Sequence, residues 1–168
     1  NRNTTDGFNV LAQGLPLERG DEVLFSSLNH DGASVCWEHH GAPRGVRVRR
    51  FEIPARSIPE LDETEVIRLH VDAIHDATRV LVLPHIDNMI GLRTPVRAIA
   101  DAARARGVDF VLVDGAQSAG MLELDVPALG ADAYCMSPHK WVQGPKGVGL
   151  LYVSQSLRGQ LRAQTVTW

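Results

Sequence analysis

The chain has 168 residues, of which 44% are hydrophobic and 22% charged, which allows one domain with a buried core and excludes a disordered or coiled-coil protein. Its 17 basic and 20 acidic residues form no long run of either sign, so we expect neither a nucleic-acid-binding nor a membrane-surface protein. Arginine supplies fifteen of the 17 basic residues, and the two lysines, Lys140 and Lys146, share one short segment. Either this segment needs an amine, or the bias reflects composition and chance.

The cysteine content and the apolar runs indicate the expected setting of the protein. Cys36 and Cys135 are too few for a disulfide framework, and no secretory signal is visible, so we expect a cytoplasmic protein. No apolar run approaches the roughly 20 residues that span a bilayer. The chain starts at Asn1 without an initiator Met and ends at Trp168 within an expected helix. We therefore expect both ends to be cuts in a longer protein.

The first predicted element is a helix at the start of the chain. Residues 3–7, Asn-Thr-Thr-Asp-Gly, precede an amphipathic stretch that contains Phe8 and Leu11. A helix start offers free N–H groups and a positive dipole end, to which Thr4 and Thr5 add hydroxyl groups. The pattern fits a phosphate site, but taken alone it favours a plain threonine cap, because threonine caps are common.

Short apolar segments, several of them apolar on both faces, predict strands. They are residues 21–26, 46–53, 79–84, 110–114, 133–137 and 149–153. Continuously apolar strands are typical of a parallel sheet that is covered by helices on both sides. The alternation of strands with helices predicts an α/β fold with a mostly parallel sheet, helices on both faces and right-handed crossovers.

Two helices between these strands have interpretable ends. Asp62 and Glu65 have the spacing of a capping box, and the row Val66, Leu69, Ala73 is expected to face the core. Farther along, Thr94 is the expected N-cap of a helix with Pro95 at its first position. An apolar stripe follows, and Gly107 is expected to end the helix. The stripe comprises Val96, Ile99, Ala100 and Ala103.

Unusual polar residues follow three of the predicted strands. The polar segments at the ends of these strands are residues 85–91, Asp114-Gly-Ala-Gln-Ser118 and Ser137-Pro-His-Lys-Trp141. In an open parallel sheet, ligands bind beyond the carboxyl ends of the strands. An acid at the end of a buried strand needs a positive partner, since a buried carboxylate without one is protonated or destabilising.

These groups together suit one cofactor, pyridoxal 5'-phosphate. Its chemistry needs a lysine to form a Schiff base and an acid to keep the pyridine nitrogen protonated, so that the ring can act as an electron sink. Lys140 and Asp114 supply these two groups, and the helix start supplies a phosphate site. No metal is expected, because the histidines outside this set lack a supporting cysteine or carboxylate ligand pattern.

The same motifs carry a resemblance to a known family. The runs Asp114-Gly-Ala-Gln-Ser-Ala-Gly120 and Ser137-Pro-His-Lys-Trp-Val-Gln-Gly-Pro-Lys-Gly147 resemble the signature of class V aminotransferase-like enzymes. This group includes cysteine desulfurases, C–S lyases, isopenicillin-N-epimerase-like proteins and some aminotransferases. The resemblance covers nearly the whole chain. It implies that residues 1–168 are most of the large cofactor-binding domain of fold type I, without the N-terminal segment and the C-terminal small domain.

The resemblance implies roles for individual residues. Lys140 forms the Schiff base and then moves the substrate Cα proton, Asp114 pairs with the pyridinium nitrogen, and Gln117 hydrogen-bonds the phenolic oxygen. His30 stacks on the pyridine ring and is expected to be catalytic together with Lys140 and Asp114, while Asn88 faces the substrate side. The positions that match phosphate-binding residues are Thr4, Thr5, Ser137 and His139. The plainer alternatives are a loop histidine at position 30 and a turn residue at position 88.

The function that this resemblance implies is a pyridoxal-phosphate enzyme acting on an amino acid. A C–S lyase or a sulfur-transferring, desulfurase-like enzyme is slightly preferred; the alternatives are an aminotransferase, an epimerase-like enzyme and a catalytically incomplete fragment. Pro138 stands where many relatives have Gly, and Asp87 and Met89 flank Asn88 where desulfurases often have Asn and Glu. These departures count against a housekeeping desulfurase. A homodimer is expected, because relatives complete the phosphate site from a second subunit.

Overall fold

In a computed structural model, which describes residues 1–54 and 61–163, six strands form one sheet in the order β2-β1-β3-β4-β5-β6. All neighbouring strands pair in parallel except β6, which is antiparallel to β5. The predicted mostly parallel sheet is confirmed, and no strand end departs from its predicted position by more than two residues. The strands are β1 (Glu22–Ser26), β2 (Arg47–Phe51), β3 (Thr78–Pro84), β4 (Phe110–Asp114), β5 (Ala133–Met136) and β6 (Leu150–Val153).

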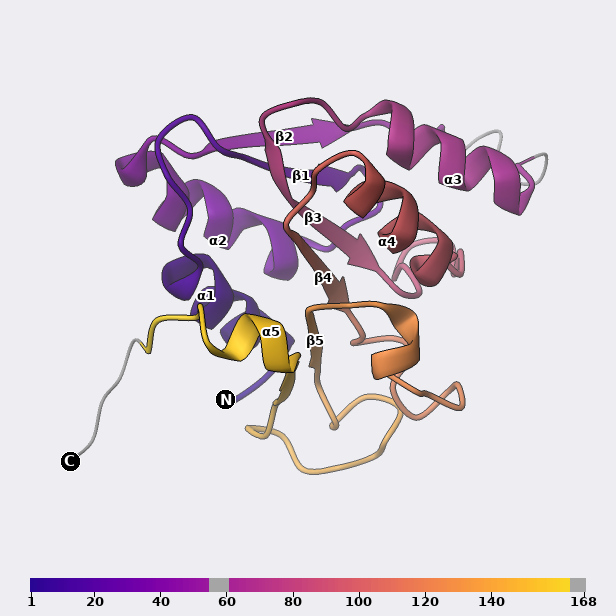
Figure 1. Cartoon of the computed structure of the whole chain (residues 1–168). Coiled ribbons are helices and arrows are strands. Elements are labelled where there is room, and N and C mark those ends of the chain that lie inside the picture. The colour runs from indigo at the N-terminus through magenta and orange to yellow at the C-terminus, as the bar shows by residue number, and fades with distance from the viewer. Residues whose placement is uncertain (55–60, 164–168) are drawn as a thin grey trace.

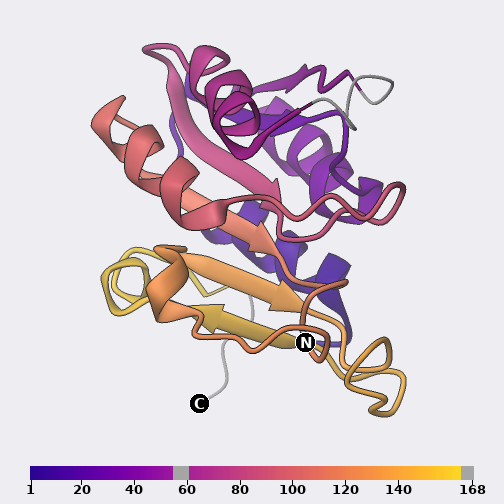
Figure 2. The same cartoon turned by 90° about the vertical axis from the view of Figure 1, so that its right-hand side faces the viewer.

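Helices cover both faces of the sheet, as predicted (Figures 1 and 2). On one face α1 (Thr4–Gly14), α2 (Asp31–Gly41) and the short α5 (Gln155–Arg158) bury a core that includes Phe8 and Trp37. On the other face α3 (Glu63–Asp72) and α4 (Val96–Ala105) bury a second core that includes Ile99. Two 3-10 turns, η1 (Ala42–Arg44) and η3 (Pro127–Leu129), complete the described elements.

The order of the strands creates a switch point beside β1. The chain passes from β1 outward to β2 and then returns to β3 on the opposite side of β1. The loops that follow β1 and β3 therefore diverge from each other and leave a crevice at the carboxyl ends of these strands. This is the edge to which the sequence assigns its polar residues.

The helix ends differ from the predictions in two places and agree in a third. The cap of α1 is Asn3, whose side chain accepts a hydrogen bond from the Asp6 N–H, so the threonine-cap interpretation is wrong. Pro95, rather than Thr94, is the N-cap of α4, and the helix begins at Val96. Gly107 follows that helix with a φ of 86°, a conformation that favours glycine, which confirms the predicted end.

The capping box of α3 forms only in part. Asp62 accepts a hydrogen bond from the Glu65 N–H at 2.8 Å, but the Glu65 carboxylate binds Arg68 instead of returning to the cap. Val66 is buried and Ala73 packs against the second core, but Leu69 is only half-buried and belongs to neither core, whereas His70 is buried. The predicted core-facing row of α3 is therefore confirmed at Val66 and Ala73 and not at Leu69. The helix expected around Trp168 lies outside the described residues.

Candidate functional site

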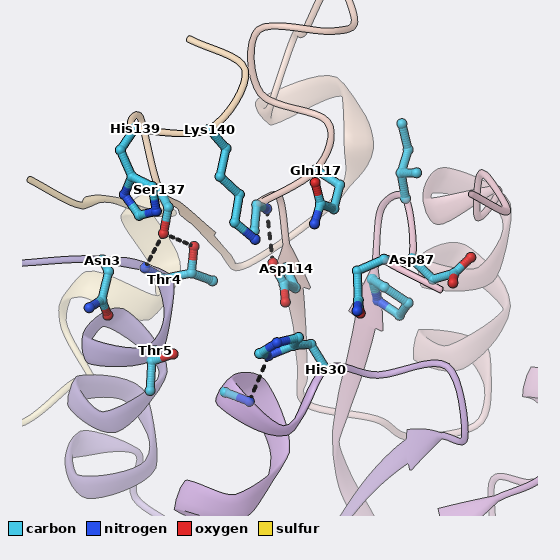
Figure 3. A pocket seen from close by; sticks show the side chains of 15 residues that line it. Asn3, Thr4, Thr5, His30, Asp87, Asp114, Gln117, Ser137, His139 and Lys140 are labelled. Carbon is cyan, nitrogen blue, oxygen red and sulfur yellow. Dashed lines mark hydrogen bonds between the residues drawn. The ribbon is translucent and has the colours of Figure 1, made fainter. Parts of the chain in front are cut away.

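A pocket lies at the carboxyl ends of β1, β3, β4 and β5, against the start of α1 (Figure 3). Its lining comes from segments that are far apart in the sequence, so the fold alone assembles it. All nine predicted site residues line this pocket, although their roles stay predictions. They are Thr4, Thr5, His30, Asn88, Asp114, Gln117, Ser137, His139 and Lys140.

The start of α1 is fastened to the loop after β5. The Thr4 N–H donates to the Ser137 Oγ at 2.8 Å, and the two hydroxyl oxygens lie 2.7 Å apart. Both residues are buried. The Nδ1 atom of His139 is also buried and has no hydrogen-bond partner within the described part of the chain. Hydroxyl groups, a helix start and an imidazole nitrogen without a partner make this corner suitable for an anionic group.

Thr5 and the start of α2 form the adjoining wall. Thr5 is exposed, and a Cβ atom at Gly32 would collide with its Oγ1, so glycine allows the two helix starts to approach closely. The Nδ1 atom of His30 accepts a hydrogen bond from the Gly32 N–H at 2.9 Å and caps α2. This bond holds the exposed imidazole at the pocket wall.

Asp114 is the buried acid of the pocket. Its Oδ1 accepts a hydrogen bond from the Ala116 N–H at 2.9 Å. Burial raises the pKa of the Asp114 carboxyl, while the Ala116 hydrogen bond and the charges of Lys140 and His30 act in the opposite direction. Lys140 extends into the pocket toward Asp114 (Figure 3), but no ion pair with Asp114 forms among the described residues. The carboxylate is thus poised for a cation that enters the pocket.

Gln117 is oriented by Trp141, a contact that the sequence did not predict. The indole N–H of Trp141 donates to the Gln117 Oε1 at 2.8 Å. This leaves the amide nitrogen as the donor group that faces the pocket (Figure 3). Trp141 is 50% exposed and contacts the pocket residue Gln117 through the polar edge of its ring. The sequence offered one signal for this contact, which is that a residue with an indole N–H donor directly follows Lys140.

Asn88 lies in a loop that a neighbouring acid holds in place. The Asp87 carboxylate is buried and accepts hydrogen bonds from the N–H groups of Met89, Ile90 and Leu92. Asn88 itself is exposed and lines the pocket, so it is both a turn residue and a pocket residue. The supporting role of Asp87 was missed, although an Asp that binds N–H groups two and three residues later is a common turn signal.

Other kinds of site are not seen in the described residues. No group of three or more His, Cys, Asp and Glu side chains within residues 1–54 and 61–163 could hold a metal ion. Over the same ranges, no helix has the length and apolar character to cross a membrane.

Comparison with known proteins identifies the family. Residues 1–166 match the family model described as aminotransferase class-V. An isopenicillin N epimerase from Amycolatopsis lactamdurans is 35% identical over 99% of this chain and 42% of its own length. A cysteine desulfurase from Yersinia pseudotuberculosis is 35% identical over 95% of this chain and 38% of its own length. This chain thus spans about two fifths of the length of these relatives.

Solved structures agree with this assignment. The cystine C–S lyase C-DES, in complex with its product cysteine persulfide, has a TM-score of 0.89 and 32% identity over 99% of this chain and 44% of its own. A C-DES mutant with glycine covalently linked to its PLP cofactor has a TM-score of 0.90 and 31% identity over 99% of this chain and 43% of its own. The chain therefore belongs to the aminotransferase class V family, as its strand-end motifs predict.

Proposed function

We propose that this chain is the cofactor-binding part of a pyridoxal-5'-phosphate-dependent enzyme that acts on an amino acid. One observation carries the proposal. The nine residues that match this cofactor's chemistry, separated by more than a hundred positions in the sequence, line one pocket at the switch point of the sheet. Membership of the class V family supports the same conclusion.

The residues of the pocket fit the cofactor at both of its polar ends. The phosphate would be held by Thr4, Thr5, Ser137 and His139, where the buried Nδ1 of His139 has no other partner in the described chain. The pyridine nitrogen would meet Asp114, whose buried carboxylate has only an N–H group as a close partner among the described residues. Each end of the cofactor would thereby satisfy a polar group that the protein itself leaves incompletely paired.

The remaining residues would act around the bound ring. When bound, pyridoxal phosphate withdraws electrons from the substrate Cα and so acidifies its proton. The Lys140 amine would attach the cofactor covalently and, once released, carry the Cα proton. The Gln117 amide N–H would bind the phenolic oxygen, His30 would stack on the ring, and Asn88 would face the substrate side.

Cleavage or transfer at a C–S bond is the preferred chemistry. Among the similar proteins, a cysteine desulfurase and a cystine C–S lyase act on sulfur-containing amino acids. An isopenicillin N epimerase is equally similar in sequence, so epimerisation is the second candidate. Transamination, which the same fold could support, is a further alternative. The test is to incubate the complete enzyme with cysteine, cystine and alanine and to assay sulfide, pyruvate and keto-acid exchange. Proton exchange at Cα without sulfide or pyruvate would favour epimerisation over C–S cleavage.

We propose that further regions complete the enzyme, because the chain spans about two fifths of its relatives' length. This chain would then be most of the large domain, and by itself it would be catalytically incomplete. A chain that turns over substrate alone, without added regions, would contradict this proposal.

A homodimer in the cytoplasm is the proposed state of the complete protein. Exposed apolar side chains follow two of the pocket residues in the sequence: Met89, directly after Asn88, is 73% exposed, and Val142, two positions after Lys140, is 50% exposed. Exposed apolar surface of this kind is typical of interfaces. Cys36 and Cys135 are both free, as expected in a reducing compartment, and both are buried, which raises the pKa of the Cys36 thiol to about 12. Light scattering on the complete protein tests the dimer, and a monomeric mass would contradict it.

Replacing Ser137 by alanine is expected to weaken binding of pyridoxal phosphate about tenfold, since a hydrogen bond to a charged group such as phosphate contributes ~1.5 kcal/mol. The substitution removes the hydroxyl that binds the Thr4 N–H and hydroxyl, and with it one expected phosphate donor. The dissociation constant is measured by titrating the cofactor and following its visible absorption. Ser156→Ala, at an exposed position of α5, is the matched control. Equal affinity of the two variants would argue against a phosphate site at Ser137.

A further inference from the structure

A buried tyrosine lies directly beneath the turn that carries Asp114 and Gln117. Tyr134 is fully buried, and its hydroxyl lies 2.6 Å from the Ser118 Oγ and 3.1 Å from the His85 Nδ1. A Cβ atom at Gly115 would overlap the Tyr134 ring, so the turn rests on this ring with no side chain between. These contacts connect three residues that do not line the pocket.

The network acts from the opposite face of the sheet. In the register of β4 and β5, Val113 pairs with Tyr134 and Asp114 pairs with Cys135. Successive side chains of a strand point to opposite faces, so Tyr134 and Asp114 leave the sheet on different sides. Tyr134 therefore contacts the turn from the face of the sheet that α3 and α4 cover, while the Asp114 carboxylate faces the pocket.

His85 closes the network onto Asp114. Its backbone N–H donates to the Asp114 carbonyl at 2.9 Å, while its ring binds the Tyr134 hydroxyl. His85 is buried, and burial lowers its pKa to about 4, with the Arg93 charge acting in the same direction. A neutral imidazole binds a tyrosine hydroxyl without placing a charge in the core.

Ser118 completes the network at the far end of the turn. Its N–H and its hydroxyl both donate to the Gly115 carbonyl, at 3.2 and 3.4 Å, and its Oγ contacts the Tyr134 hydroxyl. Both ends of the turn are thereby linked through one phenol group. Loss of that hydroxyl would free the turn without opening the core, because the ring remains in place.

We propose that His85, Tyr134 and Ser118 are positioning residues, which hold the turn so that Asp114 and Gln117 meet the bound cofactor in the required geometry. This inference rests on the proposed function. The three residues touch neither the cofactor site nor the substrate side, so they act only through Asp114 and Gln117. The Gln117 amide is expected to stabilise the deprotonated form of a cofactor oxygen, and a displaced turn weakens that effect.

The test uses the full chain, titrated with pyridoxal phosphate, with Tyr134→Phe and Ser118→Ala as variants. Both are expected to bind the cofactor about fivefold more weakly, because a turn that has lost one buried hydrogen bond must be ordered again when the cofactor binds. The pH midpoint of the visible absorption band is expected to rise by about half a unit, because the deprotonated form loses a donor. Ser118→Ala keeps the inference testable if Tyr134→Phe fails to fold.

Two controls separate positioning from stability. Tyr152 pairs with Tyr134 in the neighbouring strand and forms no hydrogen bond through its hydroxyl in the described structure, so Tyr152→Phe removes a phenol hydroxyl outside the network. Ile99→Val removes a methylene group from a fully buried side chain of α4 and is therefore expected to lower the melting temperature. Both controls are expected to keep wild-type affinity and midpoint.

The outcomes are distinct. Weaker affinity and a raised midpoint in the two network variants alone support the inference. Lower melting temperatures with unchanged affinity and midpoint overturn it and show a purely structural network. A wild-type chain that takes up no pyridoxal phosphate overturns the proposed function, and the inference with it.

Discussion

Replacing Lys140 by alanine is expected to abolish the visible absorption band that pyridoxal phosphate produces on the wild-type chain. The substitution removes the amine that would attach the cofactor and carry the Cα proton. In the complete enzyme we expect activity to fall by ~10²–10⁴-fold from the lost proton transfer alone. Absorption spectra of the cofactor-saturated proteins, together with turnover of the preferred substrate, measure the two effects.

The chain provides its own control for this experiment. Its only other lysine, Lys146, is exposed and does not line the pocket. Lys146→Ala is therefore expected to keep the absorption band, and borohydride should trap the cofactor on Lys140 in this variant as in the wild type. A band that survives Lys140→Ala, or a trapped cofactor on a Lys146 peptide, would refute the assignment.

The sheet was predictable because its strands are short and apolar on both faces. Such segments have few alternatives to a covered parallel sheet, and the residues after their carboxyl ends must then share one edge. For that reason Asp114 and Lys140 could be placed together without knowledge of the packing. The helix α2 was not predicted, although Ala33, Cys36 and Trp37 are spaced at three and four residues and all are buried.

The contacts that orient the site were less accessible from the sequence. Gln117 meets Trp141 and Tyr134 meets His85 only after the strands that carry them have paired, so no local pattern reports these contacts. Asp62 was predicted correctly as the cap of α3, but the predicted caps of α1 and α4 were wrong. At the start of α1 three polar residues in a row, Asn3, Thr4 and Thr5, could each act as the cap, and the sequence alone does not show that the helix begins after Asn3.

Replacing Asp114 by asparagine is expected to lower activity of the complete enzyme by ~10²–10⁴-fold while cofactor binding survives. Asparagine has nearly the same shape and retains an oxygen that can accept the hydrogen bond from the Ala116 N–H. It lacks the negative charge that would hold a pyridine nitrogen in its protonated form. The electron-withdrawing capacity of the ring therefore falls, and Cα proton removal slows. Single-turnover kinetics of Cα proton exchange measure this step directly.

The same substitution has an opposite effect on the stability of the cofactor-free chain. Burial raises the pKa of the Asp114 carboxyl above its value of ~3.9 in an unfolded chain, so the native state binds this proton more tightly. Stability then decreases as the pH rises from the unfolded pKa to the raised native pKa, and the loss persists at neutral pH. A neutral asparagine side chain carries no such penalty. Asp114→Asn should therefore melt at a higher temperature than wild type at pH 7, by roughly 2–4 °C for each kcal/mol removed.

Melting curves between pH 3 and pH 8, with and without pyridoxal phosphate, test this pair of effects. Below the unfolded pKa, near pH ~3, the advantage of Asp114→Asn should vanish because both chains are then neutral at this position. Added cofactor should stabilise the wild type more than the variant, since only the wild type offers a carboxylate to the ring nitrogen. Asp76→Asn, at an exposed site outside the pocket, should match wild type throughout. A variant that is less stable than wild type at pH 7 without cofactor, yet fully active with it, would show that Asp114 is a structural acid and not the partner of the ring nitrogen.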